Sequence, residues 1–301
     1  MKGAEARRAT LRLRATAPFD FGRSLRFLEY FPPAARDQTT ADGVLTRAVR
    51  SGGRTVVFRV RSTGTVEAPR LAATLHATGS LDRRTRAAVR ARIIDHLSLE
   101  DDLEPFYHLA HADPPLAERV EQLYGLHQVR FLTPFESACW AVLAQRVPLE
   151  GAKRMKRALA ERYGEVAELE GQRYPAFPEP GDLAGATEQE LAPVLGNARK
   201  ARAVAAVAAA FAGVDEEFLR AGDRAEVEGW LRSIHGVGEW SAAFVLFRGL
   251  GRMEPMPLTE PMLRAARSAY GARTSEARIR KIADAYGRWQ GYWVLYLRAT
   301  V

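Results

Sequence analysis

The chain has 301 residues, 47% of them hydrophobic, which is enough to bury one large core or two to three small ones. Its 44 Lys and Arg residues outnumber its 36 Asp and Glu residues, and the net charge of +8 and pI near 9.9 favour a polyanionic partner. The single cysteine, Cys139, excludes an internal disulfide and a four-cysteine iron–sulfur cluster, and the six scattered histidines show no metal-ligand spacing.

The first hundred residues have the pattern of a small sheet with helices. The N-terminal stretch MKGAEARRATLRLRA carries charges without the apolar segment of a secretory signal, and no apolar run in the chain approaches the roughly 18 residues of a membrane span. We therefore expect a cytoplasmic protein that does not enter a membrane. The pattern predicts strands at Arg8–Thr16, Gly43–Val49, Thr55–Ser62 and Leu71–Thr78, a turn at Gly52-Gly53, and helices at Phe19–Tyr30 and Arg83–Leu97.

From about Leu99 onward the strand signal vanishes and prolines punctuate helices. Thr187 followed by Glu190 is typical of a capping box. The predicted helices are Glu136–Gln145, Leu149–Tyr163, Asn197–Phe211, Asp223–Trp230, Ser275–Tyr286 and Trp289–Leu297, with a loop over Tyr174–Gly181. We predict an α+β protein in which a small N-terminal domain of antiparallel sheet and helices (residues 1–100) precedes an all-helical body (residues 101–301).

Residues 231–250, LRSIHGVGEWSAAFVLFRGL, are the most informative stretch of the chain. Gly236 and Gly238 separate an apolar turn from a helix of small residues that begins near Trp240. Such glycines permit a tight turn with exposed N–H groups, and a phosphate can approach closely because there is no Cβ atom. A purely structural turn explains a bare GxG pattern about as well. Downstream, in PMPLTEPMLRAARSAYG, Glu260 opens a further helix.

The hairpin, the small-residue helix, the short connector and the acid-headed helix together resemble the helix-hairpin-helix (HhH-GPD) DNA glycosylases, in particular the bacterial 3-methyladenine DNA glycosylase II type. The likeness covers nearly the whole chain, including the N-terminal half-sheet, and its motifs are specific in the helical part. It implies a helical body of two lobes, with the cleft between them and the hairpin at residues 231–247. It also implies a monomer without a cofactor that binds double-stranded DNA and flips a damaged base out of the stack.

The resemblance assigns DNA contacts to two stretches. In TPFESACWAVLAQRVPLEGAKRM, residues 133–155, Gln145 ends a helix and Arg146 takes the place of the residue that wedges into the duplex. An exposed arginine at a helix end is the alternative for Arg146. In the hairpin, N–H groups around Gly236, Gly238 and Glu239 would hold a phosphate without reading the sequence. The hairpin carbonyls that often hold a Na+ or K+ ion in the family correspond to Arg232, Ile234 and Val237.

The resemblance places the base pocket at Trp240. Lyase-competent relatives have a lysine there that forms a Schiff base with the sugar, and because tryptophan cannot do so the chain would be a monofunctional glycosylase. Phe244, one helical turn later, would extend an aromatic wall, although a plain core tryptophan is the alternative. The remaining pocket candidates are Trp293, Tyr296 and Arg298. Arg298 stands where these enzymes commonly present an aromatic ring and would repel a cationic base, whereas the other two compensate for it or belong to the core.

Glu260 is the catalytic candidate, because it aligns with the essential Asp that the family places at the head of this helix. A carboxylate there stabilises the oxocarbenium-like sugar and orients the attacking water. The extra methylene of Glu moves the charge by about 1.5 Å, a displacement that costs roughly 100-fold in a positioned site. Because Glu caps helices poorly, we expect Thr259 to take over the capping role. The alternative is an exposed helix-start glutamate favoured by the helix dipole.

The sequence thus predicts a base-excision-repair DNA glycosylase, a hydrolase that flips an alkylated purine and hydrolyses its N-glycosidic bond. Two other hypotheses stay open: a non-catalytic damaged-DNA-binding homologue, and a glycosylase for a different lesion, which Arg298 favours. A basic helical protein unrelated to DNA is the remaining alternative.

Overall fold

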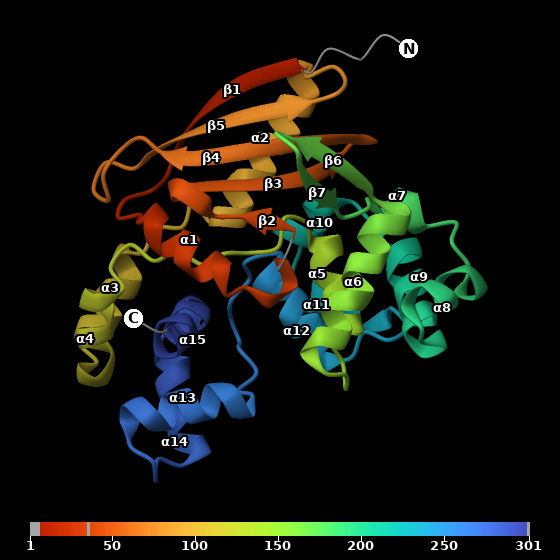
Figure 1. Cartoon of the computed structure of the whole chain (residues 1–301). Helices are drawn as coiled ribbons and strands as arrows, with labels where there is room; N and C mark the ends of the chain where they lie inside the picture. Colours follow the sequence, from red (N-terminus) through yellow and green to blue (C-terminus); the bar gives the residue numbers. More distant parts are fainter. Residues whose placement is uncertain (1–6, 35–36, 300–301) are drawn as a thin grey trace, which may run out of the picture.

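The computed structural model describes residues 7–34 and 37–299, with a strand-rich N-terminal part and a largely helical remainder (Figure 1). The strands are β1 (Arg7–Arg14), β2 (Gln38–Thr39), β3 (Val44–Ser51), β4 (Arg54–Ser62), β5 (Arg70–Ala77), β6 (Glu165–Leu169) and β7 (Gln172–Ala176). The helices are α1 (Phe21–Glu29), α2 (Arg83–Leu97), α3 (Glu104–His111), α4 (Pro114–Gln122), α5 (Pro134–Leu143), α6 (Leu149–Tyr163), α7 (Pro180–Leu183), α8 (Glu188–Leu195), α9 (Ala198–Gly213), α10 (Glu216–Ala221), α11 (Arg224–Ser233), α12 (Glu239–Phe244), α13 (Glu260–Tyr270), α14 (Glu276–Ala285) and α15 (Gln290–Arg298). Short turns of other helix types are η1 (Pro32–Ala34), η2 (Ala41–Gly43), η3 (Val245–Gly249) and η4 (Gly287–Trp289).

Strands β1 to β5 form one antiparallel sheet in the order β1-β5-β4-β3-β2. Alternate residues of the strands, such as Leu13, Phe58 and Leu75, are buried on one face and share a core with α1 and α2. Gly52 and Gly53, with φ of 62° and 72°, make the turn between β3 and β4. The strands and helices predicted for the first hundred residues are confirmed to within two residues at each end, and β2 was not expected.

A second sheet, the hairpin of β6 and β7, shows that the expectation of an all-helical body was wrong. The hairpin lies on the outer face of the large sheet, where Tyr174 and Ala176 pack against Ala48 and Val57. Strand β7 occupies the start of the predicted loop Tyr174–Gly181. Two strands of five residues carry little signal of their own, because their apolar partners come from distant strands of the chain.

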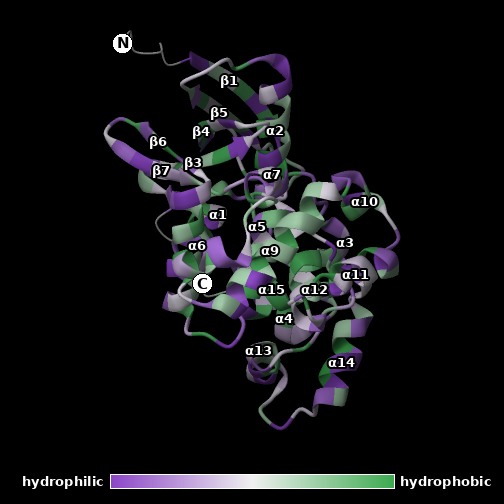
Figure 2. Cartoon of the chain, turned by 90° about the vertical axis from the view of Figure 1, so that its right-hand side faces the viewer, coloured by the Kyte–Doolittle hydropathy of each residue, from purple (hydrophilic) through white to green (hydrophobic). Residues whose placement is uncertain are grey.

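The helical remainder is built around two cores. One joins α5, α6, α8, α9, α11 and α12, and Figure 2 shows the hydrophobic residues gathered on α9 and the helices beside it. The other joins α3 and α4 with α13, α14 and α15, so this lobe combines segments far apart in the chain. The mixed α+β fold class is confirmed, and the boundary at residue 100 stays a prediction. None of the described helices is both long and apolar enough to cross a membrane.

Capping residues close in sequence set the ends of α8 and α9, two helices of the first core. Thr187 and Glu190 bond reciprocally at the start of α8, which confirms the capping box. Gly196, with φ of 62°, ends α8 in the left-handed conformation. Asn197 then caps α9, because its side chain accepts a hydrogen bond from the N–H of Lys200 at 3.0 Å.

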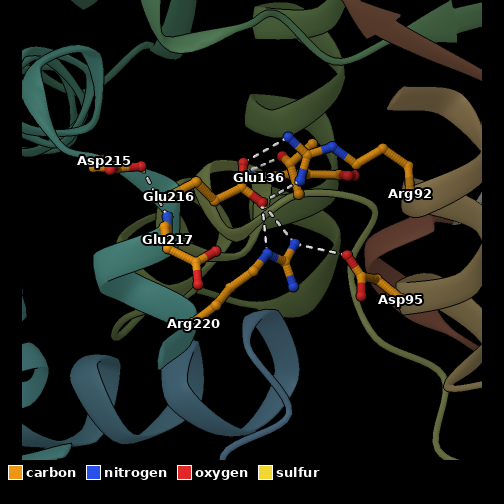
Figure 3. A network of polar contacts seen from close by, with 8 residues as sticks. Arg92, Asp95, Glu136, Asp215, Glu216, Glu217 and Arg220 are labelled. Carbon is orange, nitrogen blue, oxygen red and sulfur yellow. Dashed lines mark hydrogen bonds and ion pairs between the residues drawn. The ribbon is translucent and has the colours of Figure 1, made fainter. Parts of the chain in front are cut away.

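Two ionic networks join the N-terminal part to the helical body. In the first, Arg92 of α2 donates to both carboxylate oxygens of Glu216 in α10 at 2.5 and 2.6 Å (Figure 3). Arg220 contacts Glu216 at 2.6 Å and Asp95 of α2 at 2.7 Å. Burial opposes ionisation of Glu216, but hydrogen bonds and charge from Arg92 outweigh it and lower the pKa of this carboxyl.

The second network is buried. Glu136 of α5 contacts Arg47 of β3 at 2.7 Å and Lys156 of α6 at 2.8 Å, and Lys156 also contacts Asp37 at 2.5 Å. Burial opposes ionisation of Glu136, but the charges of Arg47 and Lys156 outweigh it and lower the pKa of Glu136 to about 2. The packing of α5 against the sheet therefore depends on ion pairs that are buried away from water.

Candidate nucleic-acid interface

A surface groove, called the hairpin groove below, joins the end of α5, the start of α9 and the turn between α11 and α12. Nine of the residues singled out from the sequence line it: Gln145, Arg146, Arg232, Ile234, Gly236, Val237, Gly238, Glu239 and Trp240. Residues that the sequence analysis missed also line it, among them Asn197, Arg199, Lys200, His235 and Ser241. Three arginines and one lysine line the groove but only one acidic residue, Glu239, so the groove suits a polyanion.

The hairpin turn runs from the end of α11 at Ser233 to the start of α12 at Glu239. Gly236 has φ of +89°, and a Cβ atom there would lie 2.6 Å from the Cβ of Ala203 in α9. This position therefore requires glycine both for its conformation and for its close packing. Within residues 7–34 and 37–299, the backbone N–H groups of Gly236, Gly238 and Glu239 have no hydrogen-bond acceptor. The turn thus presents a set of free donors, as a phosphate site requires.

The carbonyl groups of the turn fit the expected cation ligands in part. The carbonyl of Ile234 accepts a hydrogen bond from the N–H of Val237 at 3.0 Å, which leaves it a second lone pair. The carbonyls of Arg232 and Val237 accept no hydrogen bond from the described part of the chain. No group of three or more His, Cys, Asp or Glu side chains in that part could hold a metal ion. A monovalent ion held by backbone oxygens stays a prediction.

Gln145 and Arg146 follow the last turn of α5. The side-chain amide of Gln145 donates to the carbonyl of Gly236 at 2.9 Å and to the hydroxyl of Ser241 at 2.7 Å, so it is tied to the hairpin. Arg146 is exposed and has φ of +53°, in the left-handed region that L residues rarely adopt. Such strain in a residue at a groove is typical of a functional position.

Trp240 is 42% exposed and is not a core residue. Its ring lies 5.3 Å from that of Phe244, which lies 5.8 Å from Phe131. Phe131 in turn lies 5.4 Å from Phe31 of the N-terminal part. These four rings form a continuous aromatic wall that runs from the hairpin groove toward α1.

Glu260 lies at the first position of α13, in the other lobe, and its side chain is 61% exposed. Its charged partners among the described residues are Arg264 and Arg267 of its own helix, at 3.9 and 3.8 Å. The capping role expected of the Thr259 hydroxyl is wrong, because that side chain makes no capping hydrogen bond. The main-chain carbonyl of Thr259 instead accepts from the N–H groups of Met262 and Leu263, both at 2.9 Å.

Two of the other pocket candidates lie in the core. Trp293 and Tyr296 are both 0% exposed. The indole of Trp293 donates to the hydroxyl of Tyr270 at 2.8 Å, and the hydroxyl of Tyr296 lies 3.0 Å from that of Tyr107. Their expected place in the base pocket is therefore corrected: the α15 face that bears them packs against α3 and α13 and does not face solvent.

Arg298, by contrast, is exposed at the end of α15, and a second arginine lies near it. The guanidinium of Arg248 lies 4.8 Å from the ring centre of Phe31 and 5.3 Å from that of Phe27. No ion pair or side-chain hydrogen bond involves Arg248 in residues 7–34 and 37–299. Burial, followed by the charges of Arg298 and Arg130, lowers the pKa of Arg248 to about 9. The sequence analysis missed Arg248, because two of its aromatic neighbours, Phe27 and Phe31, come from a distant part of the chain.

Known proteins resemble this chain in sequence and in fold. Residues 139–284 match the family model described as HhH-GPD superfamily base excision DNA repair protein. The chain is 30% identical over 211 residues to the DNA-3-methyladenine glycosylase of Bacillus subtilis (strain 168). The matched region covers 68% of this chain and 69% of that protein. The 3-methyladenine DNA glycosylase from Archaeoglobus fulgidus matches with a TM-score of 0.79 at 22% identity, over 95% of this chain and 97% of that chain. The Clostridium acetobutylicum 8-oxoguanine glycosylase/lyase, solved with double-stranded DNA, matches with a TM-score of 0.69 at 16% identity, over 99% and 97% of the two chains.

Proposed function

This chain belongs to the HhH-GPD superfamily of base excision DNA repair proteins, and from that premise we propose that it is a DNA glycosylase that hydrolyses the N-glycosidic bond of a damaged base flipped out of duplex DNA. The observation that carries the proposal is the hairpin groove, in which a wedge candidate, a turn with free N–H donors and an exposed aromatic ring lie together. We propose alkylated purines as the substrate, because the Bacillus subtilis relative is named for 3-methyladenine.

Duplex DNA would bind along the hairpin groove. The N–H groups of Gly236, Gly238 and Glu239 would hold one phosphate without reading the sequence, and a monovalent ion on the hairpin carbonyls would add positive charge beside it. The exposed side chain of Arg146 would fill the gap that the flipped nucleotide leaves.

The flipped base would stack on Trp240 and the aromatic wall behind it. Lyase-competent members of the family carry a lysine at this position, and an indole has no amine with which to form a Schiff base. We therefore propose a monofunctional enzyme, whose products are the free base and an abasic site.

Glu260 would supply the catalytic carboxylate. As the C1′–N bond breaks, its electron pair leaves with the base and positive charge develops on the sugar. The ionised carboxylate would stabilise that charge and accept a proton from the water whose oxygen bonds to C1′. In the free protein Glu260 is exposed beside Arg264 and Arg267, and such weak surface pairs leave the carboxylate free to turn toward bound DNA.

The decisive experiment measures base release from alkylated duplex DNA under single-turnover conditions. We expect Glu260→Gln to lose at least about 100-fold in rate, because it removes the charge on which the transition state depends. Glu276→Gln is the matched control, since Glu276 is also an exposed first-turn glutamate, at the start of α14. Equal background rates for the unmodified protein and Glu260→Gln would refute hydrolysis and leave a non-catalytic DNA-binding protein.

A neutral lesion is a second candidate substrate, favoured by the two arginines beside the aromatic wall. Arg248 lies over Phe31, the inner ring of that wall, and Arg298 is close enough to lower the pKa of Arg248. Two cations in this place disfavour a cationic alkylated base. Oligonucleotides that carry alkylated, deaminated or oxidised purines would separate the two candidates by their rates of base release.

A further inference from the structure

Three segments of the hairpin groove meet at Gln145. Its side-chain amide donates to the hairpin at Gly236 and Ser241, at 2.9 and 2.7 Å. Its backbone carbonyl accepts a hydrogen bond from the ammonium group of Lys200 in α9 at 2.7 Å. The residue that follows it is Arg146, the proposed wedge. One residue thus links the wedge, the hairpin and α9.

Lys200 is directed at the end of α5. Its side chain lies in the first turn of α9, the residue is 7% exposed, and the ammonium donates to the carbonyls of Val142 and Gln145 at 2.6 and 2.7 Å. These carbonyls lie at the C-terminal end of α5, where helical partners run out and the helix dipole is negative. No carboxylate pairs with Lys200 in the described part of the chain. The ammonium therefore caps the C-terminal end of α5.

The bond to the carbonyl of Gln145 fixes the peptide group that precedes Arg146. Arg146 has φ of +53°, and rotation of this peptide group is the direct route by which the backbone would relax to an ordinary conformation. That rotation would break the contact with Lys200. Ala203 lies one turn further along α9 and packs closely on Gly236. A Cβ atom added to Gly236 would lie 2.6 Å from the Cβ of Ala203. Helix α9 therefore contacts both parts of the groove: Lys200 binds the peptide group before Arg146, and Ala203 packs against the hairpin at Gly236.

We propose that Lys200 is a positioning residue, which locks Arg146 in its left-handed conformation and holds it in a fixed place relative to the hairpin. The proposal rests on the proposed function, because it assigns Lys200 a role that is exercised through the wedge. A lysine that contacts a phosphate directly would also line the hairpin groove and carry the same charge. The experiment must separate these two roles.

The probe is a duplex with a tetrahydrofuran abasic analogue and 2-aminopurine beside it, so that fluorescence reports insertion of the wedge and anisotropy reports affinity. Lys200→Met keeps an unbranched side chain one atom shorter and removes the charge and the donors, whereas Lys200→Arg keeps both charge and donors. We expect Lys200→Met to reduce affinity about ten- to a hundredfold, the effect of losing a charged hydrogen bond, and to abolish most of the fluorescence change. Lys200→Arg should stay within about threefold of the unmodified protein.

Arg199→Met is the matched control, because Arg199 is an exposed cation of the same groove that makes no hydrogen bond with the end of α5 among the described residues. Affinity falls as salt rises, and the loss of one phosphate contact reduces the steepness of log affinity against log salt concentration by about 1. We expect this smaller slope for Arg199→Met, and an unchanged slope for Lys200→Met. A slope reduced by about 1 in Lys200→Met would overturn the proposal and make Lys200 a phosphate ligand.

A double variant supplies the second criterion. In an Arg146→Ala background, Lys200→Met should cause no further loss of affinity, because a positioning residue acts through the side chain that has been removed. A full additional loss would overturn the proposal. Lys200→Leu, which also has no donor, replaces Lys200→Met if thermal unfolding shows that the latter does not fold. Failure of the unmodified protein to release any base would refute the proposed function alone, since the abasic duplex reports insertion without catalysis.

Discussion

The buried contact between Glu136 and Arg47 provides a stability prediction whose magnitude follows from the structure. Glu136 is 1% exposed and faces both Arg47 and Lys156, which lower its pKa from 4.5 to about 2. By linkage, that difference between the folded and the unfolded chain corresponds to about 3 kcal/mol at neutral pH. Removal of one partner from a buried ion pair costs a similar ~3–5 kcal/mol. We therefore expect Glu136→Gln to reduce the free energy of unfolding by about 3 kcal/mol or more at pH 7.

Urea unfolding followed by circular dichroism at several pH values measures this loss. Because the pKa of Glu136 is lowered on folding, its contribution is complete above pH 4.5 and is lost as the pH falls toward 2, so the two proteins should converge there. Glu165→Gln is the control: Glu165 pairs with Arg50 at 3.0 Å, but its side chain is 50% exposed, and the expected loss is below ~1 kcal/mol. A loss of under ~1 kcal/mol for Glu136→Gln at pH 7, or a difference that persists at pH 2, would refute the reasoning.

Two further predictions concern the hairpin groove. Gly236→Ala should lower both the thermal midpoint and the affinity for duplex DNA, the latter about tenfold or more, since φ is +89° and the new Cβ would lie 2.6 Å from Ala203. Gly238→Ala should leave the thermal midpoint unchanged, because φ is −88° and nothing lies within 4 Å of the added atom; equal midpoints for the two variants would contradict the packing argument. Trp240→Ala should change the thermal midpoint little, since the ring is 42% exposed, yet reduce affinity for lesion-bearing DNA about ten- to a hundredfold in anisotropy titrations, the effect of losing one stacked base. Undiminished lesion binding by this variant would remove Trp240 from the base site.

Patterns short in sequence predicted much of this fold and site. Alternation gave the expected strands of the first hundred residues, and capping residues such as Thr187 set helix ends. The resemblance to the HhH-GPD glycosylases assigned the two glycines and the residues at positions 145, 146 and 240 to one site, and the structure brings them together in the hairpin groove. The strands and the helix ends arise from interactions between residues a few positions apart, which a linear sequence displays directly.

Tertiary structure alone decided which groups meet from distant parts of the chain. In the sequence, Lys200 is one of several cations in an alanine-rich helix. Its contact with the carbonyl of Gln145 exists because α9 packs against the end of α5. Trp293 and Tyr296 are of the aromatic types that often line binding pockets, but the packing of α15 against α3 and α13 buries both. The β6–β7 hairpin likewise depends on the outer face of a sheet formed more than a hundred residues earlier. The amino-acid sequence determined most of the secondary elements and the hairpin motif, because these rest on local periodicity and turn chemistry. Burial and charge pairing were decided by the folded structure, because they depend on which surfaces the packed elements cover.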